Sequence, residues 1–390
     1  MDPPGELEDV SSVCLNCMSL PLREAARELA GWSDPESDDY PVLDSCSFCD
    51  SKVDSGSGNV AISWEQYMDL VYEGLSTLFV PGSEQGNPPS DGGDGLDWLT
   101  VDEVLSFCDG AVGAGGPPLL REIGYALSND VWTYRNFGWD RADLPFGWKR
   151  FREYARDSDG FHSSVVMPPE KFLGKLEMIV SVVVSDAIEV IAAGTKLWRA
   201  RPHKESTPDF VPCGAELGSA PASVAGNNRF SPEGVSMFYG AEDPDTTFAE
   251  LDYSSHRYAT LGQFQTSREL VILDLSDVNY FPNIFDPAER DDYHAADFLH
   301  GFVAEIARPL VDGDDYRPTQ RVVSEGIQTF TIQPVDGIRY RSAKSPGRFN
   351  YVLFFERADC GDLGADDGTV LQLDPDSVQA GVDLKLRSAD

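Results

Sequence analysis

Hydrophobic positions in the first half of the chain follow the period of a helix. Between residues 62 and 193, apolar side chains recur three and four positions apart, most clearly in ISWEQYMDLVYEGLSTLF. Thr100 followed by Glu103 has the form of a capping box, which predicts that a helix begins there. Residues 172–193 predict one long buried helix. The first half of the chain is therefore expected to be mostly helical.

The pattern changes near Thr195, where short apolar runs such as LVILDL and FNYVLFF stand between turn residues and predict strands. The last run, TVLQLDPDSVQAGVDLKL, predicts either two edge strands or a loose tail. Helical and strand-rich parts that are separate along the chain favour an α+β fold.

These changes divide the chain into four predicted parts. Residues 1–58 hold paired cysteines, and residues 59–193 form a mostly helical domain interrupted by a mobile loop at 81–95, PGSEQGNPPSDGGDG. Residues 194–360 form a mixed β-sheet domain, and residues 361–390 form a C-terminal extension.

The strongly negative net charge of the chain argues against general binding of nucleic acids. The net charge of −36 comes from 66 acidic and 30 basic residues, so most of the surface would repel DNA or RNA. A host adapted to high salt and a genome rich in G and C would both give this composition. The start, MDPPGELEDV, lacks the features of a secretory signal, and the stretch 178–193 is too polar to span a membrane. We therefore expect a cytoplasmic protein with reduced cysteines.

Four cysteines form two pairs, Cys14-Leu-Asn-Cys17 and Cys46-Ser-Phe-Cys49. This spacing lets four thiolates close around one tetrahedral zinc ion. Four sulfur ligands leave no open coordination position, so the predicted zinc is structural. The alternative of unrelated buried cysteines stays open, because the segment between the pairs is longer than in a usual zinc ribbon.

A short basic segment interrupts the acidic chain. Guanidinium groups suit a phosphate or diphosphate because their donors form a planar fork. The alternative is a solvated strand end paired with surface carboxylates. The basic residues are Lys196, Arg199, Arg201, His203 and Lys204, followed by Arg229 in a Gly-Asn-Asn-Arg turn.

The segment GVSMFYGAEDPDTTFAEL predicts a strand ending at Tyr239 and a helix beginning near Thr246, with Glu250 in the first turns of that helix. A carboxylate facing the arginines would stabilise a developing sugar cation. A surface position for Glu250 is the alternative.

These segments, in this order, resemble the RES domain family, which is named for characteristic Arg, Glu and Ser residues. The resemblance rests on LWRAR at 197–201, NNRFSPEGVSMFYGAEDPDTTFAEL at 227–251, and YRPTQ followed by GIRYRSAKSPGRFNYVLF. It implies a mixed sheet similar to that of ADP-ribosyltransferases and an activity that degrades NAD. Two asparagines stand between Gly226 and Arg229, where the family usually has a glycine directly before the arginine, so a reshaped phosphate loop is expected.

The resemblance also implies roles for individual residues. Arg199 and Arg229 would hold the NAD phosphates. Apart from the resemblance, a phosphorylase needs room for a second anion, which surplus cations such as Arg201, His203 or Lys204 would provide. Tyr239 would stack on the nicotinamide or its ribose, Glu250 would stabilise the ribosyl cation, and Ser342 would bind substrate through its hydroxyl.

Larger relatives of this family carry an N-terminal HEPN-like domain, which residues 1–190 resemble. The pair Arg156 and His162 has the spacing of a HEPN ribonuclease site, but the turn sequence between them argues against that function.

The predicted function is cleavage of the nicotinamide–ribose bond of NAD, by water or by phosphate, in a toxin or phage-defence protein. An ADP-ribosyltransferase acting on a macromolecule and a non-catalytic nucleotide-binding protein are the alternatives. An antitoxin or regulatory protein and a second copy of the chain are the partners expected besides NAD.

Overall fold

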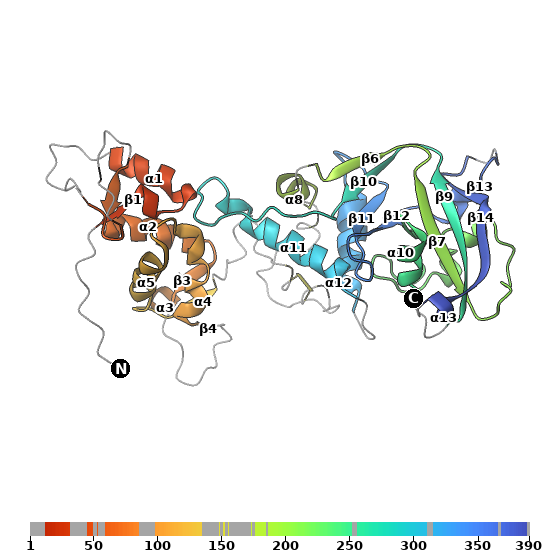
Figure 1. Ribbon diagram of the computed structural model, residues 1–390, viewed down its shortest axis with the longest axis horizontal. Helices are drawn as coiled ribbons and strands as arrows, with labels where there is room; N and C mark the ends of the chain where they lie inside the picture. Colours follow the sequence, from red (N-terminus) through yellow and green to blue (C-terminus); the bar gives the residue numbers. More distant parts are fainter. Residues whose placement is uncertain are drawn as a thin grey trace. The chain divides into compact units, whose positions relative to one another are not determined.

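The chain forms two compact units, each with its own core (Figure 1). Unit 1 comprises Met1–Arg141 together with Phe281–Tyr293, and unit 2 comprises Ala142–Tyr280 together with His294–Asp390. The computed structural model describes residues 12–31, 45–49, 53, 59–85, 98–134, 148, 151–152, 155, 173, 176–184, 186–251, 256–309, 315–365 and 368–387.

Unit 1 combines helices with two small sheets. The helices are α1 (Leu20–Gly31), α2 (Trp64–Leu75), α3 (Gly82–Gln85), α4 (Val101–Leu105) and α5 (Gly116–Leu127), with 3-10 turns at Leu15–Cys17 and Cys108–Ala111. The antiparallel sheets are β1 (Ser12–Cys14) with β2 (Ala61–Ser63), and β3 (Phe79–Pro81), β5 (Trp132–Tyr134) and β4 (Trp98–Leu99) in that order. The prediction of a mostly helical first half is thus confirmed for α2, α4 and α5. It missed the short strands β1 to β5.

The predicted helix start at Thr100 is confirmed. The Thr100 backbone N–H donates to the Glu103 carboxylate at 2.7 Å, and the Glu103 backbone N–H donates to the Thr100 hydroxyl at 3.3 Å. The predicted loop at 81–95 is wrong at its start, where Pro81 ends β3 and α3 follows. The remainder of that loop lies outside the described residues, as do Arg156 and His162.

A segment from the second half of the chain completes the core of unit 1. Phe285 is fully buried in the hydrophobic cluster that also holds α2 and α5. Its ring packs on Gly74 so closely that a Cβ atom there would lie 2.4 Å from it. Asn283 donates to the Gly110 carbonyl at 3.2 Å, and Arg290 pairs with Glu73 at 2.9 Å.

The compact units therefore have other boundaries than the predicted ones at residues 58 and 193. Cys14 and Cys17 share the hydrophobic cluster of α2, so the cysteine pairs are part of unit 1. The excursion Phe281–Tyr293 lies between two elements of the sheet domain along the chain, and its place in the core of unit 1 was not predicted from the sequence.

Unit 2 is built on a mixed sheet of nine strands, in agreement with the predicted α+β class. Two neighbouring pairs, β10 with β11 and β13 with β14, are parallel, and the other pairs are antiparallel. In spatial order the strands are β13 (Cys360–Asp362), β14 (Leu371–Asp383), β9 (Tyr258–Thr266), β7 (Lys196–His203), β8 (Phe238–Ala241), β12 (Phe349–Leu353), β11 (Gly337–Arg341), β10 (Leu270–Asp274) and β6 (Ile188–Ile191).

Two predictions at the ends of this sheet need comment. The single helix expected at 172–193 is wrong: α8 (Leu176–Val183) is followed by strand β6. Asp186 has φ of 61°, a left-handed conformation that a continuing helix does not adopt. At the other end, the C-terminal run forms one long, irregular strand, β14, which pairs with β9 and β13.

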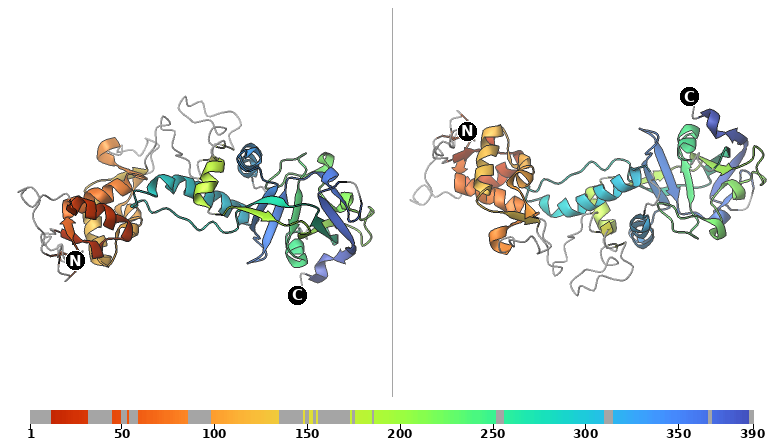
Figure 2. Two further views of the ribbon diagram at one scale, coloured as in Figure 1. Left: turned by 90° about the horizontal axis from the view of Figure 1, so that it is seen from above. Right: turned by 90° about the horizontal axis from the view of Figure 1, so that it is seen from below.

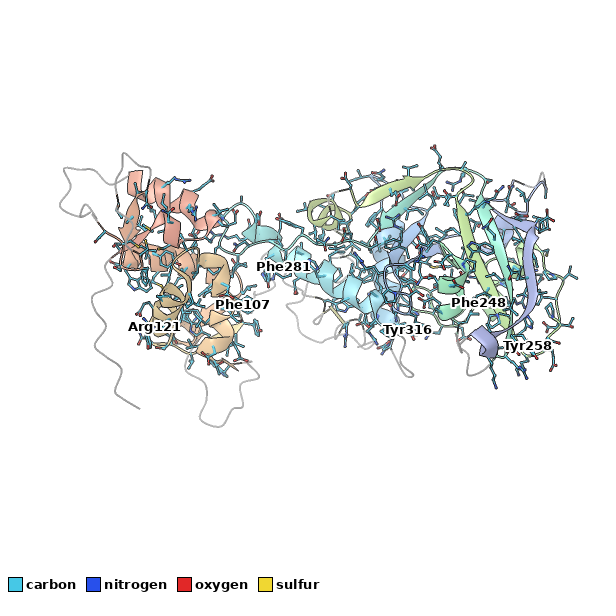
Figure 3. The ribbon with its side chains drawn as sticks, viewed as in Figure 1. Phe107, Arg121, Phe248, Tyr258, Phe281 and Tyr316 are labelled. Carbon is cyan, nitrogen blue, oxygen red and sulfur yellow. The ribbon has the colours of Figure 1, made fainter. Side chains whose placement is uncertain are left out.

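Helices cover both faces of the sheet. Successive side chains of β7 point to opposite faces, so Leu197 packs with Leu217 of α9 (Gly214–Leu217), whereas Trp198 packs with Phe248 of α10 (Pro244–Ala249). Phe248 is labelled in Figure 3. The short helix α13 (Leu384–Arg387) lies beside α10 in both views of Figure 2.

The remaining helical elements of unit 2 connect strands of the sheet along the chain. They are α11 (Tyr293–Ala307), which begins at the boundary of the two units, α12 (Arg317–Arg321), a π-helical turn at Val322–Gly326, and 3-10 turns at Ile327–Thr329, Ala222–Val224 and Arg357–Asp359. Within the described parts of the chain, no helix is long and apolar enough to cross a membrane.

Candidate functional site

Unit 2 contains a cavity of about 410 Å³ where strands β7 and β8 diverge. Within these two fully described strands, the one pair in register is Trp198 with Ala241. Residues of β7, β8, β11 and β12 line the cavity, together with residues of the segments 220–230 and 306–309. Four of the predicted site residues line this cavity: Arg199, Arg229, Tyr239 and Glu250.

Arg199 is held in place by backbone carbonyl groups. Its Nε donates to the carbonyls of Leu217 and Gly218, both at 2.9 Å, and its Nη1 donates to the Tyr239 carbonyl at 2.6 Å. Burial lowers the pKa of Arg199, and neighbouring Arg201 lowers it further, yet the group stays protonated. The Nη2 group has no acceptor among the described residues, so Arg199 keeps donors for an anion.

Arg229 is held at the C-terminal end of α11. Its two Nη groups donate to the carbonyls of Ile306 and Arg308, the latter at 2.6 Å, and so satisfy carbonyls that the ending helix leaves unpaired. Burial lowers the pKa of Arg229, and the positive charge of Arg308 adds to this effect. An anion in the cavity would compensate this buried positive charge.

The loop that carries Arg229 is fixed by α12, which comes from the segment YRPTQ. The Gln320 side chain donates to the Asn227 side chain and to the Asn228 carbonyl, both at 2.7 Å. The Thr319 hydroxyl donates to the Arg229 carbonyl. The two asparagines that depart from the family pattern are therefore integrated into a loop held by hydrogen bonds.

Aromatic rings form one wall of the cavity. The Tyr239 hydroxyl lies 2.9 Å from the Ser231 hydroxyl, and burial raises the pKa of Tyr239 to about 12. The Phe230 ring lies 5.0 Å from that of Tyr340 and 6.5 Å from that of Tyr239, measured between centroids. Burial raises the pKa of Tyr340 as well. This wall is neutral near pH 7 and offers flat apolar surface.

Glu250 lies directly after α10 and not in its first turns as predicted. The helix begins at Pro244, capped by the Asp243 carboxylate, and Glu250 is its C-cap residue. One carboxylate oxygen, Oε1, accepts from the Ser342 hydroxyl at 2.6 Å and from the Asn350 amide at 2.7 Å. The other oxygen, Oε2, has no hydrogen-bond partner among the described residues.

The other predicted cations lie outside the cavity lining. Arg201 pairs with Glu216 at 2.9 Å, and its guanidinium lies over the Phe210 ring at 4.1 Å from the centroid. His203 is buried between the Glu205 carbonyl and the Thr260 hydroxyl. Lys204 is exposed and absent from the lining. Glu216 and Phe210 engage the Arg201 side chain, and its predicted contact with substrate stays a prediction.

Sequence reasoning missed several lining residues, of which Arg308, Lys344 and Asn350 bear on the chemistry. Lys344 donates to the Glu250 carbonyl at 3.4 Å, and Arg308 pairs with Glu305 at 2.6 Å. Of the charged side chains that line the cavity, four are cations and one is a carboxylate, in a chain of net charge −36. This reversal of charge favours an anionic ligand.

The four paired cysteines gather in unit 1. All four Sγ atoms lie within 4.8 Å of one another, with 3.6 Å between Cys14 and Cys49 and 3.7 Å between Cys17 and Cys46. Tetrahedral zinc with Zn–S bonds of about 2.3 Å requires sulfur separations of about 3.8 Å, so the donor set fits zinc. The backbone N–H of Cys14 also points at the Cys46 sulfur, at 3.3 Å.

Residues 196–374 match the RES domain family. The match begins two residues after the predicted start of the sheet domain at residue 194 and extends beyond the predicted end at residue 360, into β14. No curated protein and no solved structure matches the chain. The matched segment is a RES domain, a family linked to NAD-related toxins. The HEPN likeness of the N-terminal region stays a prediction.

Proposed function

We propose that the RES domain of this protein binds NAD in the cavity between β7 and β8 and cleaves its nicotinamide–ribose bond. One observation carries this proposal: Arg199, Arg229, Tyr239 and Glu250, drawn from separate segments, line a single cavity of about 410 Å³. That volume lies within the range of small-molecule sites, about 300–1,000 Å³.

Different parts of the cavity would bind the diphosphate and the nicotinamide ring of NAD. The diphosphate would accept hydrogen bonds from the unused donors of Arg199 and Arg229, which backbone carbonyls hold in place before the ligand arrives. The nicotinamide ring would lie on the aromatic wall of Tyr239 and Phe230.

Cleavage would proceed through a sugar cation. Nicotinamide leaves as a neutral molecule and takes the electron pair of the C–N bond, so positive charge develops on the ribose. Negative charge on Glu250 stabilises that cation. Water then adds to the anomeric carbon and releases one proton, which gives ADP-ribose. Alternatively, inorganic phosphate adds and gives ADP-ribose 1″-phosphate.

Nicotinamide release from NAD by the full chain tests this proposal. We expect turnover by the wild type and a loss of about 100-fold or more in kcat for Glu250→Gln, which keeps the size of the side chain but removes its charge. Parallel reactions with and without inorganic phosphate identify the acceptor. A wild-type protein that leaves NAD intact in both buffers would overturn the proposal.

Labelled NAD distinguishes the two other functions that the cavity permits. Label retained on protein or nucleic acid would indicate an ADP-ribosyltransferase. Stable NAD binding without product would indicate a non-catalytic nucleotide-binding protein.

Loss of NAD harms a cell, so we propose a role as a toxin or phage-defence effector that a regulatory protein or antitoxin restrains. Co-expression supports this role if the wild type stops growth and Glu250→Gln does not. We also propose that Cys14, Cys17, Cys46 and Cys49 hold a structural zinc ion, which supplies no open position for catalysis.

A further inference from the structure

The hydroxyl group of Ser342 is fully used within the protein. Its single proton is donated to Glu250 Oε1 at 2.6 Å. Its oxygen accepts from the backbone N–H groups of Lys344 at 3.3 Å and Ser345 at 3.0 Å. A serine hydroxyl offers one donor and two acceptor positions. Ser342 in this arrangement therefore orients the carboxylate and has no donor left for a substrate.

Asn350 approaches the same carboxylate oxygen from strand β12. This strand lies between β8 and β11, and the Asn350 side chain is 4% exposed. Its Nδ2 donates to Glu250 Oε1 at 2.7 Å. Its Oδ1 is buried without a hydrogen-bond partner among the described residues. A buried unpaired oxygen costs stability, and an apolar residue in this apolar strand would avoid that cost.

The geometry points to Asn350 as a positioning residue for Glu250, an inference that rests on the proposed function. Asn350 and Ser342 together occupy Oε1 of Glu250, so Oε2 is the oxygen that remains for the sugar cation. Two donors on one oxygen fix the rotation of the carboxylate, because its plane must suit both hydrogen bonds. The amide thus acts on the reaction through its hydrogen bond to Glu250.

A double-mutant cycle on kcat, with substitutions at Asn350 and Glu250, separates this role from a purely structural one. Asn350→Leu keeps the approximate volume, removes the donor to Glu250 and removes the unpaired oxygen. We expect kcat for nicotinamide release to fall about 10–100-fold, as is usual when a supporting hydrogen bond is lost, with KM for NAD changed less than about threefold. In the Glu250→Gln background the same substitution should change kcat less than about twofold, because the group it positions has lost its charge.

Thr266→Val is the matched control, since it removes one buried hydrogen bond, to the Ala192 carbonyl at 3.0 Å, from β9 of the same sheet. We expect its kcat to match the wild type in both backgrounds. Additive losses for Asn350→Leu and Glu250→Gln, or an unchanged kcat for Asn350→Leu alone, would overturn the positioning role.

Crystal structures provide a readout that does not depend on NAD turnover. In the double variant Ser342→Ala with Asn350→Ala, we expect the Glu250 side chain to leave its wild-type rotamer or to occupy several, while β12 stays in register with β8. A Glu250 carboxylate that keeps its position in this variant would refute the inference. A wild type without turnover would refute the proposed function alone, and the crystallographic comparison would still decide the role of Asn350.

Discussion

Arg199 and Arg201 stand two positions apart on strand β7, yet only Arg199 lines the cavity between β7 and β8. Their side chains project from the same face of the strand, as alternation requires. The carbonyls of Leu217 and Gly218 accept hydrogen bonds from Arg199. Arg201 instead forms an ion pair with Glu216, and its guanidinium lies over the Phe210 ring. Two residues on one face of a strand therefore have different surroundings, and of the two only Arg199 lines the cavity.

The pair provides a matched test of phosphate binding. Arg199→Lys keeps the positive charge but loses the planar fork, and a lost charge-assisted hydrogen bond is worth about 1.5–3 kcal/mol. We expect kcat/KM for NAD and the affinity for ADP-ribose to fall about 10–100-fold. Arg201→Lys should change both by less than about threefold. Steady-state nicotinamide release and calorimetry with ADP-ribose measure these effects, and equal losses in the two variants would contradict the assignment.

The resemblance singled out residues that line the cavity better than it predicted the contacts that support them, and their catalytic roles stay predictions. Arg199, Arg229, Tyr239 and Glu250 were found by the resemblance of ordered segments, and the cavity brings them together. Asn350 was missed, although a polar residue inside the apolar run FNYVLFF is a signal of a buried hydrogen bond.

Contacts between distant segments explain the remaining differences. Residues 188–191 lie in an apolar run that also suits a helix, and pairing with β10 makes them a strand. The excursion that carries Phe285 into unit 1 has no periodic signature, because its burial is decided by a core formed mostly by the first 130 or so residues.

The buried Tyr239 side chain should make the free energy of unfolding of unit 2 fall at alkaline pH. Its pKa of about 12 in the folded protein lies above the ordinary value of 10, so the neutral form is favoured by folding. This contribution is complete below pH 10 and is lost as pH rises from 10 to 12, at about 1.4 kcal/mol per pH unit. At pH 9, Tyr239→Phe should be about 1 kcal/mol less stable than wild type, because it lacks the hydrogen bond to Ser231.

At pH 11 we expect that difference to disappear or reverse, since only the wild type has lost the Tyr239 contribution. Denaturant unfolding at the two pH values measures the free energy of unfolding of both proteins. The same wild-type advantage at pH 9 and at pH 11 would contradict the role of Tyr239.

The cysteine cluster predicts one zinc ion per chain. Cys14→Ser weakens a ligand of the tetrahedral site, so we expect loss of zinc and a marked fall in the melting temperature of unit 1. Cys108→Ala is the matched control, because Cys108 is fully buried in the same hydrophobic cluster but outside the group of four. Elemental analysis should find zinc in the control and not in Cys14→Ser. Equal metal content in both variants, or none in the wild type, would refute a zinc site.

Phe285 should stabilise unit 1 although it lies far along the chain, among segments of the RES domain. Phe285→Ala removes a fully buried ring that packs on Gly74, and such a substitution costs about 3–5 kcal/mol. We expect faster hydrogen exchange in α2 and in the turn Cys108–Ala111, whereas Phe281→Ala should have little effect because that ring is 53% exposed. Hydrogen-exchange mass spectrometry resolves the affected segments. Protection of α2 that survives Phe285→Ala would show that the segment Phe281–Tyr293 does not contribute to this core.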